Sequence, residues 1–250
     1  MGGEWQTLAP LVVAPFVGSF LGLLASRMPK GEGVMLGRSR CPACGTALGA
    51  GDLVPLVSYA VLRGRCRYCA APIDPLCPLM ELAALGVAAW AVLVLPPALV
   101  WWGCLLAWSL LPLAVIDWLC LRLPDGLTLF LGGGGMVFTV AVVPGRSLDH
   151  GIGAAAGLAL CWLVAFAYRR CRGREGLGLG DAKLMAAAGA WVGWQGLGSC
   201  LLIGAVIALV GILVAAGLGR RIAADQALPF GSALCLGLWL TWAHGPLLFG

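Results

Sequence analysis

The sequence predicts an all-α polytopic membrane protein with about eight transmembrane helices and one longer loop after the first of them. Of its 250 residues, 61% are hydrophobic and only 11% are charged, whereas a soluble domain is usually about 25% charged. Apolar runs of about 15–20 residues, long enough to cross a bilayer as helices, recur along the chain. They lie near residues 8–26, 78–95, 98–116, 127–143, 150–168, 182–196, 199–218 and 229–249.

The first apolar run, Leu8–Leu24, is expected to be a transmembrane helix rather than a cleaved signal peptide. No basic segment precedes it and no small-residue cleavage site follows it. Pro96 and Pro97 mark the turn between the second and third runs. The run near 182–196 is the weakest, because it is short and opens beside Asp181 and Lys183.

Basic residues concentrate on alternate loops, and this asymmetry predicts the topology. By this assignment 15 of the 16 basic residues fall on one face, and only Arg146 falls on the other. The positive-inside rule makes the basic face cytoplasmic and places both termini outside. A nucleic-acid partner is not expected, because these residues are scattered over short loops. They are Arg27, Lys30, Arg38, Arg40, Arg63, Arg65, Arg67, Arg122, Arg169, Arg170, Arg172, Arg174, Lys183, Arg220 and Arg221.

The long loop at 29–77 contains two C-x2-C pairs separated by 21 residues. Four thiolates at this spacing suit a tetrahedral structural zinc site, and Gly45 after the first pair favours a tight turn. A loop of this size cannot bury enough apolar surface to fold alone, so a metal would supply the missing stability. A redox pair is the alternative, and disulfides are disfavoured on a reducing cytoplasmic face. The expected ligands are Cys41, Cys44, Cys66 and Cys69.

Asp117 and Asp181 lie at the ends of apolar runs, and an ionised carboxylate at the bilayer centre costs about 3 kcal/mol or more. Two carboxylates brought together can share one proton and activate a water against a peptide carbonyl. The pair therefore predicts an aspartic protease at a membrane surface. The plainer alternatives are that Asp181 only caps the next helix and that Asp125, which follows Pro124, is a turn residue.

A glycine-rich stretch, Gly176-Leu-Gly178-Leu-Gly180, leads directly into Asp181. It does not indicate a nucleotide site, because a phosphate-binding fingerprint needs a preceding strand in a βαβ unit. We expect the glycines to permit non-helical backbone at the membrane border. We expect Asp181 to occupy the N-cap of the following helix, where a carboxylate accepts backbone N–H groups.

Short motifs occur along the chain in the order typical of one family. Together they resemble the type IV prepilin peptidases, the bifunctional bacterial leader peptidases and N-methyltransferases, over nearly the whole chain. The motifs are Gly18-Ser19 with Arg27-Met-Pro29, Ser39-Arg-Cys41-Pro-Ala-Cys44, Leu53-Val-Pro55-Leu-Val-Ser58-Tyr59, Gly64-Arg-Cys66-Arg-Tyr-Cys69, Pro78-Leu-Met-Glu81-Leu, Ile116-Asp117 with Leu123-Pro124-Asp125, and Gly178-Leu-Gly180-Asp181-Ala-Lys183-Leu.

The resemblance implies that Asp117 and Asp181 are the catalytic pair of a membrane aspartic endopeptidase. Its implied substrates are prepilins and type II secretion pseudopilins. Their positively charged leader would be removed at the cytoplasmic face of the bacterial inner membrane. The new N-terminal residue would then be N-methylated with S-adenosylmethionine as donor. Supporting positions are implied at Asp125, Lys183, Gly178, Gly180 and Glu81.

The resemblance also divides the chain. It implies a first transmembrane helix at 1–28, a cytoplasmic zinc domain associated with methylation at 29–77, and a transmembrane peptidase domain at 78–250. Glu81 lies four residues into an apolar run, and its simplest interpretation is an interfacial charge that snorkels to water. The family match adds a role for it in binding the substrate or the methyl donor.

The chain departs from the family pattern at three positions, none of them in the aspartate pair. Gly22 stands where Asn is frequent, and Cys77 stands where an aromatic residue commonly precedes Pro78. Ser232 follows Phe230-Gly231 where Pro is usual.

Three rival functions make different predictions. A peptidase without methyltransferase activity would usually lack the tetracysteine loop. A transporter that uses paired aspartates as a proton relay would hold them near the bilayer midplane, between broken helices related by a repeat. Here the acids lie at the ends of apolar runs, and no repeat is evident. A zinc hydrolase needs an open coordination position, which four cysteine ligands do not leave.

Overall fold

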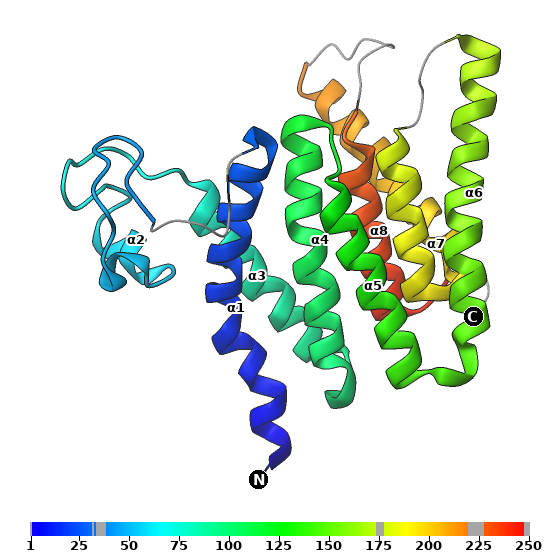
Figure 1. Cartoon of the computed structure of the whole chain (residues 1–250), viewed down its shortest axis with the longest axis horizontal. Coiled ribbons are helices and arrows are strands. Elements are labelled where there is room, and N and C mark those ends of the chain that lie inside the picture. Colours follow the sequence, from blue (N-terminus) through cyan, green and yellow to red (C-terminus); the bar gives the residue numbers. More distant parts are fainter. Residues whose placement is uncertain (1, 32, 34–38, 174–177, 220–227, 248–250) are drawn as a thin grey trace. The chain divides into compact units, whose positions relative to one another are not determined.

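A computed structural model of the chain describes residues 2–31, 33, 39–173, 178–219 and 228–247 (Figure 1). Within these ranges the secondary structure is helical and no strand is formed, apart from two isolated bridges in the cysteine loop. The α-helices are α1 (Gly2–Arg27), α2 (Val57–Val61), α3 (Leu76–Val94), α4 (Val100–Cys120), α5 (Asp125–Val142), α6 (Ser147–Arg172), α7 (Leu179–Gly217) and α8 (Phe230–His244). Short 3-10 helices are η1 (Met28–Lys30), η2 (Ala50–Leu53), η3 (Pro97–Leu99) and η4 (Pro144–Arg146).

The prediction of an all-α, multi-pass membrane protein is confirmed. In the described part of the chain, six helical segments are long and apolar enough to cross a membrane. The expected count of about eight is not confirmed. Two of the predicted runs, 182–196 and 199–218, correspond to the two parts of α7, which are joined by a kink at Gly193. The last predicted run corresponds to α8, which has 15 residues. The basic residues Arg38, Arg174, Arg220 and Arg221, and Gly176 of the glycine-rich stretch, lie outside the described residues.

Helix α7 consists of two limbs that meet at Gly193, whose backbone is not helical (φ 66°, ψ −179°). A side chain is rarely tolerated at this φ, so glycine is suited to the position. In the second limb Gly196 faces Thr241 of α8 and Gly204 faces Leu234, so this limb runs antiparallel to α8. Leu123 lies against both Gly180 and Gly231. The second limb therefore returns toward the end at which the first limb began.

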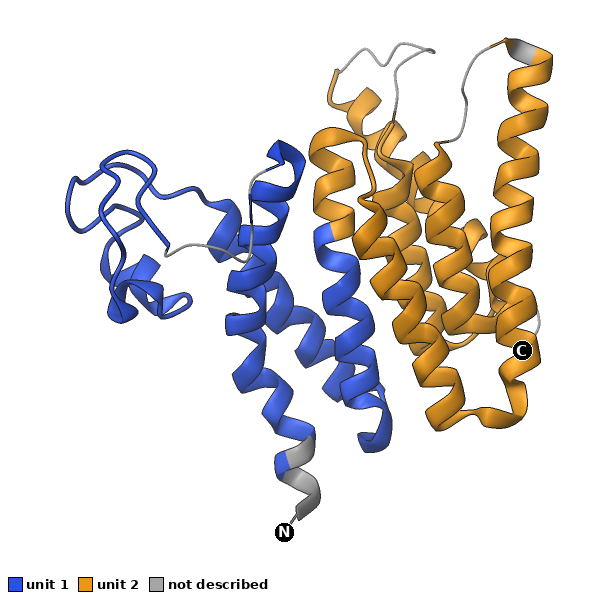
Figure 2. Ribbon diagram, viewed as in Figure 1, with its two compact units in different colours: residues 1–112 blue, residues 113–250 orange. Residues whose placement is uncertain are grey.

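The chain forms two compact units, residues 1–112 and 113–250 (Figure 2). The boundary falls at Pro112, inside α4, and so does not coincide with the expected domain boundary at residue 78; that division remains a prediction. In the first unit α1 packs closely on α3, where a Cβ atom on Gly18 would lie 2.6 Å from the Cα atom of Glu81. The indole of Trp108 donates to the Ala84 carbonyl oxygen (3.1 Å) and joins α4 to α3.

In the second unit the first limb of α7 is the central element. Gly189 of this limb and Gly153 of α6 are in contact without intervening side chains, a close packing that small residues permit between membrane helices. The carbonyl oxygen of Ala190 accepts from the Thr139 hydroxyl (3.2 Å) and lies 3.0 Å from Nδ1 of His150. Buried polar side chains are thus satisfied by α7 backbone groups, as an environment without water requires.

Candidate functional site

The carboxylate of Asp117 is held by the start of another helix. Asp117 lies in the last turn of α4 and its residue is only 5% exposed. The backbone N–H of Ser232, in the first turn of α8, donates to Oδ2 of Asp117 over 2.7 Å. The first N–H groups of a helix have no partner within the helix and favour an anion. The buried carboxylate of Asp117 and the otherwise unpaired N–H of Ser232 therefore satisfy each other.

Gly231 fits closely over Asp117. A Cβ atom at this position would lie 3.0 Å from Cγ of Asp117 and 3.0 Å from Cδ1 of Leu123. The absence of a side chain therefore lets the α8 backbone approach the carboxylate. In the sequence, Ser232 was notable only as a departure from a family pattern, and Gly231 only as its neighbour. The start of an apolar helix after Pro229 was the available signal that amides would be exposed there.

Asp181 is the third residue of α7 and is partly exposed. Its backbone N–H donates to the carbonyl oxygen of Gly178 (3.1 Å), and Gly178 is the N-cap. The expectation that Asp181 itself is the N-cap is therefore wrong. The extended backbone of Gly178 (φ −69°, ψ 145°) starts the helix, and Asp181 lies within the first turn, where the helix dipole still favours an acid.

The two aspartates lie at the same end of the second unit. Leu123 packs against a neighbour of each aspartate. A Cβ atom added to Gly180 would lie 3.0 Å from Cβ of Leu123, and a Cβ atom added to Gly231 would lie 3.0 Å from Cδ1 of Leu123. The two acids are 64 positions apart in the sequence, and their pairing in catalysis stays a prediction.

Asp125 and Lys183 form an ion pair at the same end of this unit. Nζ of Lys183 lies 2.6 Å from Oδ1 of Asp125. Asp125 is the first residue of α5, after the N-cap Pro124, rather than a residue of the preceding turn. Both side chains are largely exposed, 47% for Lys183 and 75% for Asp125, so the pair contributes at most about 1 kcal/mol to stability. It links α5 to α7 but leaves Asp125 more solvated than Asp117.

The four cysteines of the loop form one cluster in the first unit. Their sulfur atoms all lie within 4.8 Å of one another, and Sγ of Cys41 is 3.8 Å from Sγ of Cys69. Tetrahedral zinc with Zn–S bonds of about 2.3 Å separates its sulfur ligands by about 3.8 Å. Cys41 and Cys66 are buried, whereas Cys44 and Cys69 are exposed. The cluster can bind a metal, and all four positions of a tetrahedral ion would be filled by protein.

The two C-x2-C segments have the same backbone structure. In the first, the Gly45 N–H donates to the Cys41 carbonyl oxygen (2.9 Å), and in the second the Ala70 N–H donates to that of Cys66 (2.9 Å). Gly45 and Ala70 both have positive φ, 70° and 57°. A tight turn was expected at each pair, and a glycine in the sequence favours it only at the first. The second pair forms it with an alanine, which tolerates the conformation less readily.

The thiols of the cluster differ in acidity. Hydrogen bonds from the Thr46 side chain and backbone lower the pKa of Cys44 to about 6. The Ala71 N–H favours the thiolate of Cys69, but partial desolvation and the three neighbouring thiols outweigh it and raise the pKa of Cys69 to about 12. Four thiols this close cannot all ionise unaided. A bound divalent cation would favour the thiolate form of all four, because a metal binds thiolates.

Glu81 is buried rather than snorkelling. Its residue is 5% exposed, and Oε2 accepts the backbone N–H of Leu56 over 2.7 Å. Leu56 precedes α2 with φ 61°, an unusual value for a residue with a side chain. Glu81 thus holds a strained point of the cysteine loop against α3. The snorkelling interpretation of Glu81 is therefore wrong.

Comparison with known proteins identifies two matching family models. Residues 12–95 match the bacterial peptidase A24 N-terminal domain, and residues 104–216 match the type IV leader peptidase family. Three similar proteins are named "prepilin leader peptidase/N-methyltransferase". The chain is 40% identical to one from Burkholderia pseudomallei (84% of this chain, 68% of the relative). It is 36% identical to one from Aeromonas hydrophila (92% and 87%) and 35% identical to one from Dickeya chrysanthemi (95% and 95%). No solved structure matches the chain significantly.

The cysteine cluster predicts one zinc ion per chain. Elemental analysis of the purified protein should give about one zinc, and the variant Cys41→Ser/Cys66→Ser should retain essentially none, because two thiolates bind zinc far more weakly than four. The matched control is Cys120→Ser/Cys171→Ser, which changes two exposed cysteines outside the cluster and should keep the metal. A metal-free wild-type protein whose loop resists proteolysis as well as the metal-loaded form would contradict this prediction.

Proposed function

The chain belongs to the type IV leader peptidase family, and we propose that it is a membrane aspartic endopeptidase that also N-methylates its product. The substrates are prepilins and type II secretion pseudopilins. Their leader is removed at the cytoplasmic face of the bacterial inner membrane. The observation that carries the proposal is the packing of Leu123 against Gly180, the neighbour of Asp181, and against Gly231, which contacts Asp117, so that both acids lie at one end of the second unit. The relatives bear the name of both activities.

Peptide hydrolysis needs one group to take a proton from water and another to give one to the substrate. In the proposed reaction, one carboxylate of the pair removes a proton from a water molecule that attacks the scissile carbonyl carbon. The other carboxyl group, protonated, hydrogen-bonds to the carbonyl oxygen. The carboxyl group that took the proton from water then gives it to the nitrogen of the leaving peptide, the C–N bond breaks, and the other carboxyl group keeps its proton as the carbonyl of the new carboxyl terminus forms. Two carboxylates brought together do not both ionise cheaply, so in this scheme the pair shares one proton.

The α8 amide that donates to Asp117 has a positioning role in this scheme. It fixes one carboxylate oxygen, so that the orientation of the carboxyl group is determined before the substrate arrives. Asp181 is held differently, by its place in the first turn of α7. The partly exposed Asp181 and the buried Asp117 thus approach the substrate from two helices. Asp125, paired with Lys183 at the surface, is assigned a supporting role with Gly178 and Gly180.

Methylation requires S-adenosylmethionine as donor, and zinc is assigned a structural role in the cysteine domain. The donor's methyl group must lie in line with a deprotonated substrate amine. Four sulfur ligands leave no open position for a water, so the zinc site does not serve hydrolysis. The tetracysteine cluster favours the bifunctional enzyme over a peptidase alone. A proton-relay transporter is disfavoured, because Asp117 lies in the last turn of its helix and Asp181 in the first turn.

Substitution of either aspartate tests the catalytic pair. Asp117→Asn and Asp181→Asn should each lower leader cleavage of a purified prepilin by at least about 100-fold, because an amide cannot act as acid or base. The control is Asp149→Asn at the start of α6, which should cleave normally. Full cleavage by Asp117→Asn would transfer the role to Asp125.

The close approach of α8 to Asp117 gives a second test. Gly231→Ala would place a Cβ about 3 Å from the Asp117 carboxyl carbon, and a displaced catalytic group loses rate steeply. We expect kcat for cleavage to fall about tenfold with little change in KM. Gly133→Ala in α5, where an added Cβ meets nothing within 4 Å, is the control and should retain activity. Equal activity of both variants would show that Asp117 does not depend on this contact.

The two activities are expected to be separable. Asp181→Asn should still transfer a labelled methyl group to a pre-cleaved pilin peptide, because methyl transfer needs no carboxylate pair to activate water. Glu81→Ala should impair methylation more than cleavage, since it releases Leu56 from α3. Loss of both activities in a folded Asp181→Asn variant would contradict the separation.

A further inference from the structure

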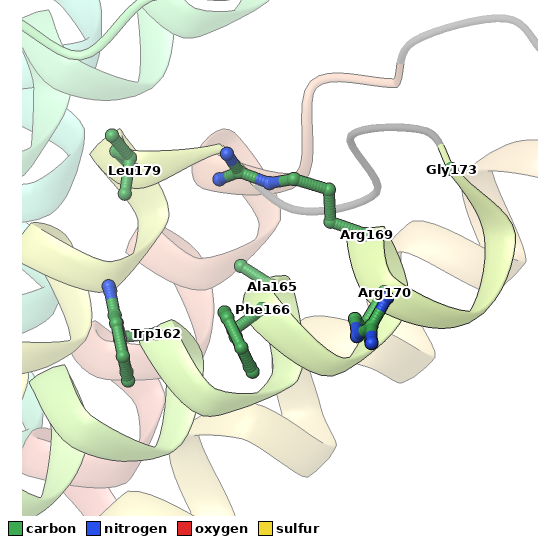
Figure 3. Close-up of a pocket in the computed structure, with 7 residues that line it drawn as sticks. All are labelled: Trp162, Ala165, Phe166, Arg169, Arg170, Gly173 and Leu179. Carbon is green, nitrogen blue, oxygen red and sulfur yellow. The ribbon is translucent and has the colours of Figure 1, made fainter.

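A pocket lies between the second half of α6 and the first turn of α7, within the second unit. Its volume is about 540 Å³, and it is lined by Trp162, Ala165, Phe166, Arg169, Arg170, Gly173 and Leu179 (Figure 3). None of these residues is used by the proposed hydrolysis. In Figure 3 the Arg169 side chain extends from α6 toward Leu179.

The pocket has an apolar wall and a cationic rim. The rings of Trp162 and Phe166 are stacked one helical turn apart, with centroids 5.6 Å apart and planes inclined by 13°. They are 54% and 52% exposed, so they form a flat apolar surface on a membrane helix. One turn further along α6, Arg169 and Arg170 follow, and both are exposed. No acidic residue is among the seven that line the pocket.

This order of side chains matches the order of groups in a phospholipid. The aromatic residues belong to a span apolar enough to cross the membrane, and the arginines lie near its end, where the basic-residue asymmetry places the cytoplasmic surface. Guanidinium groups bind phosphate oxygens in a bidentate manner, and basic pockets between membrane helices on this side accept anionic headgroups. Trp is typical of the interface between acyl chains and headgroups.

We propose that this pocket binds an anionic phospholipid of the cytoplasmic leaflet. Arg169 and Arg170 hold its phosphodiester group, and one acyl chain lies along the Trp162–Phe166 surface. Leu179 closes the other side, two residues before Asp181, so the lipid would fill the space between the end of α6 and the helix that carries this aspartate. The proposal does not depend on the proposed function.

Three other occupants match the pocket less well, two of them because they carry positive charge. A positively charged prepilin leader would be repelled by the arginines. S-adenosylmethionine has a sulfonium and an ammonium group, and none of the described residues that line the pocket offers a carboxylate to either of them. A soluble phosphate would satisfy the arginines but would leave the aromatic surface uncovered.

The test uses the full chain reconstituted in lipid nanodiscs that contain phosphatidylcholine and increasing phosphatidylglycerol. Bound lipid is then counted by native mass spectrometry after transfer to detergent. The wild type should retain phosphatidylglycerol at least about tenfold more strongly than phosphatidylcholine. Arg169→Gln/Arg170→Gln should lose this preference. The control is Arg146→Gln, which removes an exposed charge near the opposite end of α6 and should behave as wild type.

A second measurement needs no variant. A photoactivatable phosphatidylglycerol with its reactive group on an acyl chain should label a peptide containing residues 162–170 in the wild-type protein. Inorganic phosphate or S-adenosylmethionine, each at millimolar concentration, should not prevent the labelling. The proposal is overturned if the double variant keeps the lipid preference, if the label falls elsewhere, or if either soluble compound displaces the lipid.

Discussion

The hydrogen bond from the Ser232 amide to Asp117 is the interaction on which the candidate site depends. A carboxylate with 5% exposure at the end of a membrane helix is unfavourable without donors, and an unsatisfied amide at the start of α8 is unfavourable as well. The 2.7 Å contact resolves both costs at once. It requires α8 to begin beside the end of α4, and Gly231 allows the two to approach closely enough.

The reversal of α7 at Gly193 follows from this requirement. The first limb must start at the Asp117 end so that Asp181 can join the site, and the chain must then come back to the same end before α8 can begin there. The chain reverses at Gly193, whose φ is positive within an otherwise helical segment. Trp191 stabilises the region next to it, since its indole donates to the Leu131 carbonyl oxygen (2.8 Å).

The helices and the chemically distinctive residues could be predicted from the sequence, but the contacts between them could not. The apolar runs, the four cysteines and the two membrane-border aspartates each differ sharply from the surrounding residues, so a local pattern was sufficient. The role of Ser232 was beyond such a pattern, because its contribution is a backbone amide, and almost any residue provides one. Proline does not provide one, so a proline at position 232 would remove the donor to Asp117.

Glu81 was misjudged for a related reason. A single acid near the start of an apolar run can be stabilised in two ways: its side chain reaches water, or it accepts a hydrogen bond from a buried donor. The sequence contains no local feature that distinguishes them. The donor is the backbone N–H of Leu56, 25 residues earlier. The backbone of Leu56 has an uncommon conformation that residue propensities do not predict.

The same limit applies to Ala70, which adopts the conformation of Gly45 because the second C-x2-C segment repeats the hydrogen bonds of the first. Metal coordination offers a physical reason for this repetition: four sulfur atoms converge on one point only if both pairs turn in the same way, and the stability gained from the ion can exceed the strain at one alanine.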